Sequence, residues 1–150
     1  MKIFVTGGSG CLGTHLIKEL SAQGHQVRAL VRKTSDISQL ENRDNIHVVT
    51  GNILEIAALQ GVLDEIDIII HCAAKTFFLD NGKIVTGGDF QDNVAATKNL
   101  AEAAMRHKIK QFLYVSSCSA MGDYCDRERD ELDSCKPDSK YGKSKYDAEN

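Results

Sequence analysis

The sequence predicts an α/β fold in which helices cover both faces of a parallel sheet of five strands. Short apolar segments alternate with longer helical ones along the 150 residues, which is the pattern of successive βαβ units. Residues Asp67–His71 contain an unbroken apolar run, as a strand buried on both faces requires. A turn rich in glycine follows the first apolar segment directly. These features are typical of a doubly wound sheet, for which we expect the strand order 3-2-1-4-5 and right-handed crossovers.

The expected elements follow one another without internal repeats or low-complexity segments. Strands are expected at the apolar runs Ile3–Val5, Gln26–Val31, Ile46–Val49, Asp67–His71 and Phe112–Val115. Helices are expected over residues 12–24, 54–63 and 93–107 and from Ser139 onward. The apolar residues expected to share a helix face are Leu12, Leu16, Ile17 and Leu20 in the first helix, and Val94, Leu100, Ala101, Ala104 and Met105 in the third. Residues 75–92 are expected to form a long connection, and residues 118–140 a solvated polar loop without a metal site.

Composition excludes several classes of function. The hydrophobic fraction of 42% and the charged fraction of 26% are ordinary for a soluble globular chain. A net charge of −3 gives no electrostatic footprint for nucleic acid or an anionic membrane, and no apolar run approaches the length of a membrane span. The five cysteines show no metal-ligand spacing, and the chain starts without a signal-peptide pattern. We therefore expect one cytoplasmic domain over residues 1–150, with reduced thiols and no nucleic-acid or membrane partner.

Among the glycines of the first turn, Gly7, Gly10 and Gly13 stand three residues apart. They stand between the first strand and the first helix, whose N-terminus offers unpaired N–H groups and the positive end of a dipole. Without side chains, that backbone can approach a pyrophosphate closely, as in Rossmann-type dinucleotide-binding folds. The spacing of Gly7, Gly10 and Gly13 is Gly-x-x-Gly-x-x-Gly, and a plain structural turn is the alternative.

The end of the second strand bears on the choice between NAD and NADP. In folds of this kind an acidic residue at this place binds the ribose 2′-hydroxyl, whereas a nearby arginine accommodates the 2′-phosphate of NADP. Here the strand ends in Val31, followed by Arg32 and Lys33, and Asp36 lies further along. A guanidinium can pair with a phosphate through two hydrogen bonds. Arg32 therefore favours NADP over NAD, with a solvated basic turn as the alternative interpretation.

A tyrosine and a lysine, Tyr141 and Lys145, stand four residues apart near the end of the chain. On a helix these positions share a face, so the ammonium group would favour the phenolate. A tyrosine activated in this way can give or take a proton at a substrate oxygen. Ser117 follows the fifth strand, at the same expected sheet edge as the glycine turn, and could donate a hydrogen bond to a substrate carbonyl. A serine hydrolase is disfavoured because no Gly-x-Ser-x-Gly elbow surrounds Ser117.

Taken together and in order, these motifs resemble the extended short-chain dehydrogenase/reductase family, the NAD-dependent epimerase/dehydratase group. The matching stretches are Thr6–Gly13, Gly51–Ile53, His71–Ala74, Asn93–Val94, Val115–Ser117 and Tyr141–Lys145. Residues Val27–Arg32 and Val115–Ser117 look most like the branch of dihydroflavonol reductases and 3β-hydroxysteroid dehydrogenases. The resemblance spans nearly the entire chain.

The resemblance implies a role for each matching residue. Tyr141 would be the acid/base, Ser117 would polarise the substrate oxygen, and Lys145 would serve both the nicotinamide ribose and Tyr141. The implied cofactor-binding residues are Gly7, Gly10, Cys11, Leu12 and Gly13 at the pyrophosphate, Asn52 and Ile53 at the adenine, Ala73 and Ala74 at the nicotinamide ribose, and Asn93, which steadies the site. The family often has aspartate where Asn52 stands.

Two departures from the family pattern affect the function expected. Met121 precedes Gly122 where many sugar epimerases have tyrosine, which weakens a nucleotide-sugar assignment. The family's chains continue well beyond this helix, whereas the present one stops five residues after Lys145. The resemblance therefore implies an N-terminal portion, with the substrate-binding part expected after residue 150.

The predicted function is an NADP-preferring oxidoreductase or epimerase that acts on a small carbonyl or hydroxyl substrate. One alternative is a non-catalytic NADP-binding or sensing module on the same fold, and another is an inert fragment of such a protein. The resemblance also implies a homodimer, in which the helix over residues 94–107 and the helix that carries Tyr141 pair with their copies.

Overall fold

The structure is a computed structural model that describes residues 1–40, 43–55, 61–80, 83–86, 90–122 and 127–150. The chain divides into two compact units. The first, which we call the sheet unit, comprises Met1–Ala73 and Lys98–Val115. The second, which we call the tyrosine unit because it contains Tyr141, comprises Ala74–Thr97 and Ser116–Asn150. Each unit is described by itself.

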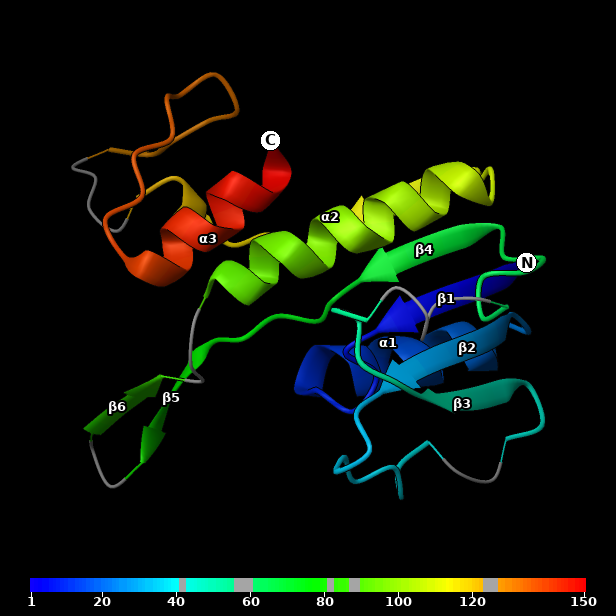
Figure 1. The fold of residues 1–150 in the computed structure, drawn as a ribbon. Coiled ribbons are helices and arrows are strands. Elements are labelled where there is room, and N and C mark those ends of the chain that lie inside the picture. Colours follow the sequence, from blue (N-terminus) through cyan, green and yellow to red (C-terminus); the bar gives the residue numbers. More distant parts are fainter. Residues whose placement is uncertain (41–42, 56–60, 81–82, 87–89, 123–126) are drawn as a thin grey trace. The chain divides into compact units, whose positions relative to one another are not determined.

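The sheet unit is built on five parallel strands. They are β1 (Lys2–Thr6), β2 (Gln26–Val31), β3 (Ile46–Thr50), β4 (Ile68–His71) and β7 (Gln111–Tyr114). Their order is β3-β2-β1-β4-β7, which confirms the predicted order 3-2-1-4-5, since β7 is the fifth strand of this sheet. Figure 1 shows β4, β1, β2 and β3 as neighbouring arrows. In the register, Thr6 pairs with both Leu30 and His71, so the carboxyl ends of the strands meet at one edge.

Helices cover both faces of this sheet, as the buried apolar runs predict. On one face, Ile17 of α1 (Cys11–Ala22) packs against Val5 and Ala29. On the other, the part of α2 (Gln91–Arg106) that belongs to the sheet unit packs Leu100 against Phe4. Because neighbouring residues of a strand point to opposite faces, Val5 and Phe4 supply the two cores.

Two apolar residues lie outside the helix faces expected for them. Leu12 is 53% exposed. At this end of α1 it is Gly13, and not Leu12, that packs against the glycine turn. Met105 is 72% exposed. The buried positions of α2 are Asn93, Ala96, Thr97, Leu100, Ala103 and Ala104, which follow helical spacing. Residue 105 lies five positions from residue 100 and therefore falls on a different side of the helix.

Among its described residues, the tyrosine unit has a small antiparallel hairpin, a short turn of 3₁₀-helix and one α-helix besides the start of α2. The hairpin pairs β5 (Phe77–Asp80) with β6 (Lys83–Thr86), within the segment expected to be a plain connection. The 3₁₀ turn η2 (Cys118–Ala120) follows Ser117, within the segment expected to be a polar loop. Helix α3 (Lys140–Glu149) begins where the sequence predicts, with Ser139 as its N-cap.

The helix expected over residues 54–63 is not found in the part of it that the structure describes. Ile53 and Leu54 lie in a turn, and so do residues 61–65, while residues 56–60 lie outside the described residues. No helix among the described residues is long and apolar enough to cross a membrane.

Candidate active site residues in the two units

The glycine turn of the sheet unit brings β1 and α1 together without room for side chains. Gly7 has a φ of +70°, and a Cβ added to it would lie 2.8 Å from the backbone N of Ala73. A Cβ on Gly13 would lie 2.1 Å from the carbonyl oxygen of Gly7. Gly10 N donates a hydrogen bond to Gly7 O at 2.9 Å and closes the turn. Two of the three predicted glycines are therefore required by close backbone contacts.

The first turn of α1 fits an anionic group. Gly10 is the N-cap, no side chain of the described residues caps the helix, and its first turn holds no acidic residue. Gly10, Cys11 and Leu12 are exposed. Unpaired N–H groups and a positive dipole end at an exposed, uncapped helix are what a pyrophosphate requires. The donor set of this chain therefore fits the dinucleotide that the sequence predicts.

A buried hydroxyl joins this turn to the end of β4. Thr6 Oγ1 accepts a hydrogen bond from Ala73 N at 3.1 Å and lies 2.6 Å from His71 Nδ1. His71 is buried beside the rings of Phe112 and Tyr114. The prediction that His71 is a packed residue and not a ligand agrees with this position. Ala73, a predicted cofactor-binding residue, is thereby held next to Gly7.

Arg32 follows β2 at the same edge of the sheet and is exposed, as is Lys33. The loop after Arg32 is fixed at two points. Ser9 Oγ donates to Ser35 Oγ at 2.9 Å, which ties the loop to the glycine turn. Asp36 accepts a hydrogen bond from the backbone N of Ser38 at 2.9 Å, and this contact lowers the pKa of Asp36. The carboxylate of Asp36 therefore forms a hydrogen bond within its own turn. Arg32 is exposed to solvent.

Asn52 lies just beyond β3 and is exposed. Its Oδ1 accepts from Leu54 N at 3.1 Å, and its Nδ2 donates to Glu55 Oε1 at 3.1 Å. Ile53 is half-buried and packs on the core. In the sheet unit the structure thus brings the glycine turn, Arg32, Asn52 and Ala73 to one edge, where the parallel strands end.

In the tyrosine unit, the ring of Tyr141 contacts two phenylalanine rings. Phe77 meets it edge to face, with ring centroids 5.8 Å apart and ring planes at 90°. Phe90 lies 5.9 Å away at 63°. Such arrangements are the preferred ones for aromatic pairs. Lys145, one turn further along α3, is buried.

Asn93 links α3 to Lys75, near the start of the tyrosine unit. Its Nδ2 donates to Lys75 O and to Ser144 Oγ, each at 3.0 Å, and its Oδ1 accepts from Lys75 N at 2.7 Å. Ser144 Oγ in turn donates to the carbonyl oxygen of Tyr141 at 2.8 Å. Because Asn93 is buried and its amide is fully hydrogen-bonded, this network fixes the position of α3 and of Tyr141 with it.

Ser117 begins the turn against which α3 packs. Its Oγ accepts from Ser119 N at 3.2 Å and so caps η2. A Cβ added to Gly142 would lie 2.2 Å from Ser119 O, so only glycine allows α3 to approach this turn so closely. The glycine next to Tyr141 therefore brings the helix of the tyrosine onto the turn of the serine.

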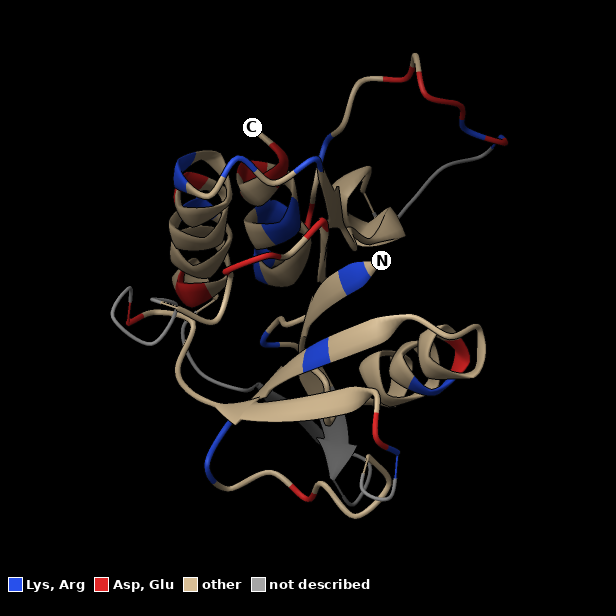
Figure 2. Cartoon of the chain, turned by 90° about the vertical axis from the view of Figure 1, so that its right-hand side faces the viewer, with Lys and Arg blue, Asp and Glu red and all other residues tan. Residues whose placement is uncertain are grey.

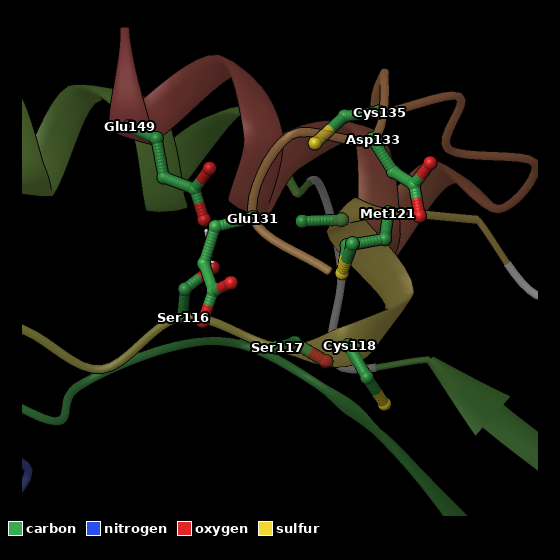
Figure 3. A pocket seen from close by; sticks show the side chains of 9 residues that line it. Ser116, Ser117, Cys118, Met121, Glu131, Asp133, Cys135 and Glu149 are labelled. Atoms are coloured by element: carbon green, nitrogen blue, oxygen red, sulfur yellow. Dashed lines mark hydrogen bonds between the residues drawn. The ribbon is translucent and has the colours of Figure 1, made fainter. Parts of the chain in front are cut away.

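A pocket of about 510 Å³ opens beside Ser117. It is lined by Ser116, Ser117, Cys118, Ala120, Met121, Glu131, Asp133, Cys135 and Glu149. In Figure 3, Ser116 and Glu149 point toward each other, and Ser116 Oγ donates a hydrogen bond to Glu149 Oε1. Asp133 is ion-paired with Arg127, whose hydrogen bond lowers the pKa of this carboxyl. Figure 2 shows acidic and basic residues following each other along the loop that leads to α3.

The structure thus distributes the predicted site over the two units. Ser117, Tyr141, Lys145, Asn93 and Ala74 belong to the tyrosine unit, and the remaining predicted residues belong to the sheet unit. Sequence analysis did not single out Phe77, Ser144 or Gly142. An Asn-Gly pair between two apolar segments, at residues 81–82, is a hairpin signal that could have drawn attention to the strand of Phe77.

Comparison with known proteins identifies the class to which this geometry belongs. The sequence model of the NAD dependent epimerase/dehydratase family matches residues 3–150. The chain therefore belongs to this family, which confirms the resemblance noted from its motifs.

Individual relatives cover several activities. A dTDP-glucose 4,6-dehydratase of Actinoplanes sp. is 28% identical over 97% of this chain and 49% of its own length. A 3β-hydroxysteroid dehydrogenase/Δ5→4-isomerase of Mycobacterium tuberculosis is 34% identical over 80% of this chain and 32% of its own length.

Solved structures show the same fold. DesIV, a dTDP-glucose 4,6-dehydratase from Streptomyces venezuelae solved with NAD and TYD, has a TM-score of 0.87 and 25% identity over 99% of this chain and 49% of its own. WbmG from Bordetella bronchiseptica, solved with NAD, has a TM-score of 0.85 and 25% identity over 99% and 48%. The chain spans half or less of the length of these relatives.

Proposed function

We propose that this chain supplies the cofactor-binding and acid/base residues of an NADP-preferring oxidoreductase or epimerase. The observation that carries the proposal is the placement of Tyr141 and Lys145 one turn apart on α3, where the network through Asn93 and Ser144 holds them. A tyrosine fixed by buried hydrogen bonds, with a buried lysine on the same helix face, suits a proton-transfer role better than a structural one.

The sheet unit would bind the dinucleotide. Gly7, Gly10 and Gly13 would form the pyrophosphate turn, and the backbone of Cys11 and Leu12 in the first turn of α1 would contact the pyrophosphate. Asn52 and Ile53 would flank the adenine, and Arg32 would pair with the 2′-phosphate of NADP. Ala73, together with Ala74 at the start of the tyrosine unit, would line the nicotinamide ribose. DesIV and WbmG, which were solved with NAD, support a nicotinamide cofactor here.

The tyrosine unit would hold and move the proton of the reaction. When bound, the nicotinamide supplies or accepts the hydride. Tyr141 would give or take the proton at the substrate oxygen, and Lys145 would favour its phenolate form. Ser117 Oγ accepts a hydrogen bond from Ser119 N, so that contact does not use the hydrogen of the Ser117 hydroxyl. That hydrogen can be donated to a substrate carbonyl, which would stabilise charge on the oxygen.

The test separates turnover from cofactor binding in the protein at its natural length. Tyr141→Phe removes only a hydroxyl, so we expect turnover to fall by about 10²–10⁴ while NADPH affinity changes little. Lys145→Met should lower both, because this lysine would serve the ribose and the tyrosine together. Combined, the two substitutions should be far from additive in turnover. Ser117→Ala should slow turnover and leave the binary cofactor complex intact.

The measurements are steady-state rates and fluorescence titration with NADPH for each variant, with Lys143→Met as the matched control. Lys143 is exposed on the same helix and lies outside the Tyr-x-x-x-Lys pair. Near-full turnover in Tyr141→Phe with NADPH binding intact would contradict the acid/base role. The chain would then be better described as a non-catalytic NADP-binding module.

A further inference from the structure

A second pocket lies at the edge of the sheet unit where the strands begin. It is lined by Lys2, Gln26, Val27, Arg28, His47 and Ile66. The first two of these begin β1 and β2, whereas the glycine turn follows the carboxyl end of β1. The pocket is therefore separate from the residues proposed to bind the dinucleotide. Its volume is about 70 Å³. Since a water molecule needs about 10–15 Å³ of such space, the pocket has room for a group of about five heavy atoms.

The register of the strands places four polar side chains of this pocket on one face of the sheet. Lys2 pairs with Gln26, and Arg28 pairs with His47. Paired residues of neighbouring strands point to the same face, and so do residues two apart in one strand. The pocket is thus bordered by an ammonium, a carboxamide, a guanidinium and an imidazole, all of which can donate hydrogen bonds.

Much of this donor set is unused. Arg28 Nη1 donates to Val62 O at 2.5 Å and to Asp64 O at 3.3 Å, which fixes one side of the guanidinium. Within the part of the chain that the structure describes, its other N–H groups have no hydrogen-bond partner, and neither do the carboxamide of Gln26 and the ring of His47. A guanidinium that is held in place with donors still open is suited to a phosphate oxygen.

The charges around the pocket favour an anion. Lys2 Nζ donates to Glu65 Oε2 at 2.8 Å, and this hydrogen bond lowers the pKa of the Glu65 carboxyl, with a smaller contribution from the charge of Arg28. Glu65 is not part of the lining, and its side chain is 75% exposed. Two positive charges on the lining therefore stand against one negative charge beside it.

We infer that this pocket binds one phosphate group, as inorganic phosphate or as the monoester of a small organic molecule, through Arg28, Gln26 and His47. A tetrahedral phosphate presents several oxygens in different directions, which matches donors that come from two neighbouring strands. A planar carboxylate has only two oxygens and would use fewer of these donors. The site is independent of the proposed function, because none of its residues is assigned to the cofactor or to the reaction.

The test is equilibrium dialysis of the protein at its natural length with radioactive inorganic phosphate. Saturating NADP⁺ is present, because phosphate could otherwise bind at the first turn of α1. We expect one phosphate per chain. Arg28→Lys keeps the charge but loses the planar fork, so it should weaken binding about tenfold. Gln26→Ala removes a neutral donor and should weaken binding about threefold to tenfold. Glu65→Gln releases the ammonium of Lys2 and should strengthen binding.

Gln111→Ala is the matched control, since Gln111 is also an exposed glutamine at the start of a strand of the sheet unit but lies outside the pocket. It should leave the affinity for phosphate unchanged. The side chain of Gln26 has no contact in the described part of the chain, so Gln26→Ala tests the site even if Arg28→Lys does not fold.

Competition experiments distinguish the two forms of the ligand. Glycerol 3-phosphate that displaces phosphate at lower concentrations than unlabelled phosphate does would identify a monoester as the ligand, and the reverse order would identify inorganic phosphate. Acetate should displace little. The inference is overturned by absence of phosphate binding, by equally effective displacement with acetate, or by an affinity that neither Gln26→Ala nor Glu65→Gln changes. In a protein that does not bind NADP⁺, which would contradict the proposed function, the response to Gln26→Ala still locates the phosphate in this pocket.

Discussion

At the scale of single residues, the proposed preference for NADP depends on Arg32. Its guanidinium is exposed beside a loop that Ser9 and Ser35 tie to the glycine turn. A hydrogen bond to a charged group contributes about 1.5–3 kcal/mol, so NADPH should bind roughly 10- to 150-fold more tightly than NADH. Arg32→Ala should remove most of that difference, as measured by fluorescence titration with both cofactors.

Lys33→Ala provides the control for Arg32. Lys33 is also exposed and carries the same charge, but it lacks the planar fork that pairs with a phosphate. Lys33→Ala should therefore change the ratio of the NADPH and NADH affinities only slightly. Equal binding of NADPH and NADH by the unmodified chain would rule out a role of Arg32 in cofactor choice.

The residues that could be found from sequence are those whose role depends on local spacing. Gly7 and Gly13 follow a strand and open a helix, and Tyr141 precedes Lys145 by one helical turn, so their patterns are visible along the chain. The contact of Asn93 with Ser144 joins residues 51 positions apart, and nothing local to either residue indicates it. The same holds for Phe77, whose ring meets Tyr141 only after the chain has folded.

At the scale of elements, the close approach of α3 to η2 depends on Gly142. Alanine is ordinarily the better helix former, by about 0.5–1 kcal/mol. Here its Cβ would lie 2.2 Å from Ser119 O, so packing should outweigh propensity. We expect Gly142→Ala to lower stability by about 1–3 kcal/mol, the usual range for overpacking. Denaturant unfolding measures this, with exposed Lys143→Ala as the neutral control. A stabilised Gly142→Ala would show that α3 can move away from the turn without cost.

Whole elements were predictable where hydrophobic periodicity is strong. All five strands of the sheet lie within a few residues of the expected runs, because each contributes apolar residues to the cores of the sheet unit. The hairpin of β5 and β6 was not expected, since its strands are short and pair only with each other. Over residues 54–63, in contrast, a helix was expected and is not found in the described residues. Apolar residues at helical spacing occur there, but the described parts of that segment form turns.

At the scale of the whole molecule, Asp67 connects three segments of the sheet unit. Its carboxylate accepts a hydrogen bond from the Lys110 side chain and another from Lys2 N at 2.9 Å. These contacts, with that of Lys110 the larger cause, lower the pKa of Asp67. Because the pKa is lower in the folded state, the stabilisation is complete above the ordinary value of about 4 and is lost as the pH falls through the folded value.

Asp67→Asn should therefore lower the melting temperature at neutral pH, and the deficit should shrink as the pH is taken down toward about 2. Lys110→Met removes the larger cause and should reproduce a good part of this pH dependence. Thermal unfolding of the three proteins across the pH range provides the measurement. A deficit that stays constant with pH would mean that Asp67 acts through packing and not through its charge.

The assembly expected from the resemblance, a homodimer through α2 and α3, stays a prediction, as does the treatment of residues 1–150 as one domain. Sedimentation of the chain at several concentrations addresses the first of these.

The contact between Gly7 and Ala73 also limits how this sequence can change over generations. A Cβ at position 7 would meet the backbone N of Ala73 at 2.8 Å and the carbonyl carbon of Cys72 at 3.0 Å. Those are main-chain atoms, which every amino acid brings with it. No substitution at position 72 or 73 can therefore make room for a Cβ at position 7. In a library that randomises positions 7, 72 and 73, the folded variants should differ at positions 72 and 73 and keep glycine at position 7. Residues 72 and 73 can therefore be substituted during evolution, but position 7 is expected to remain glycine.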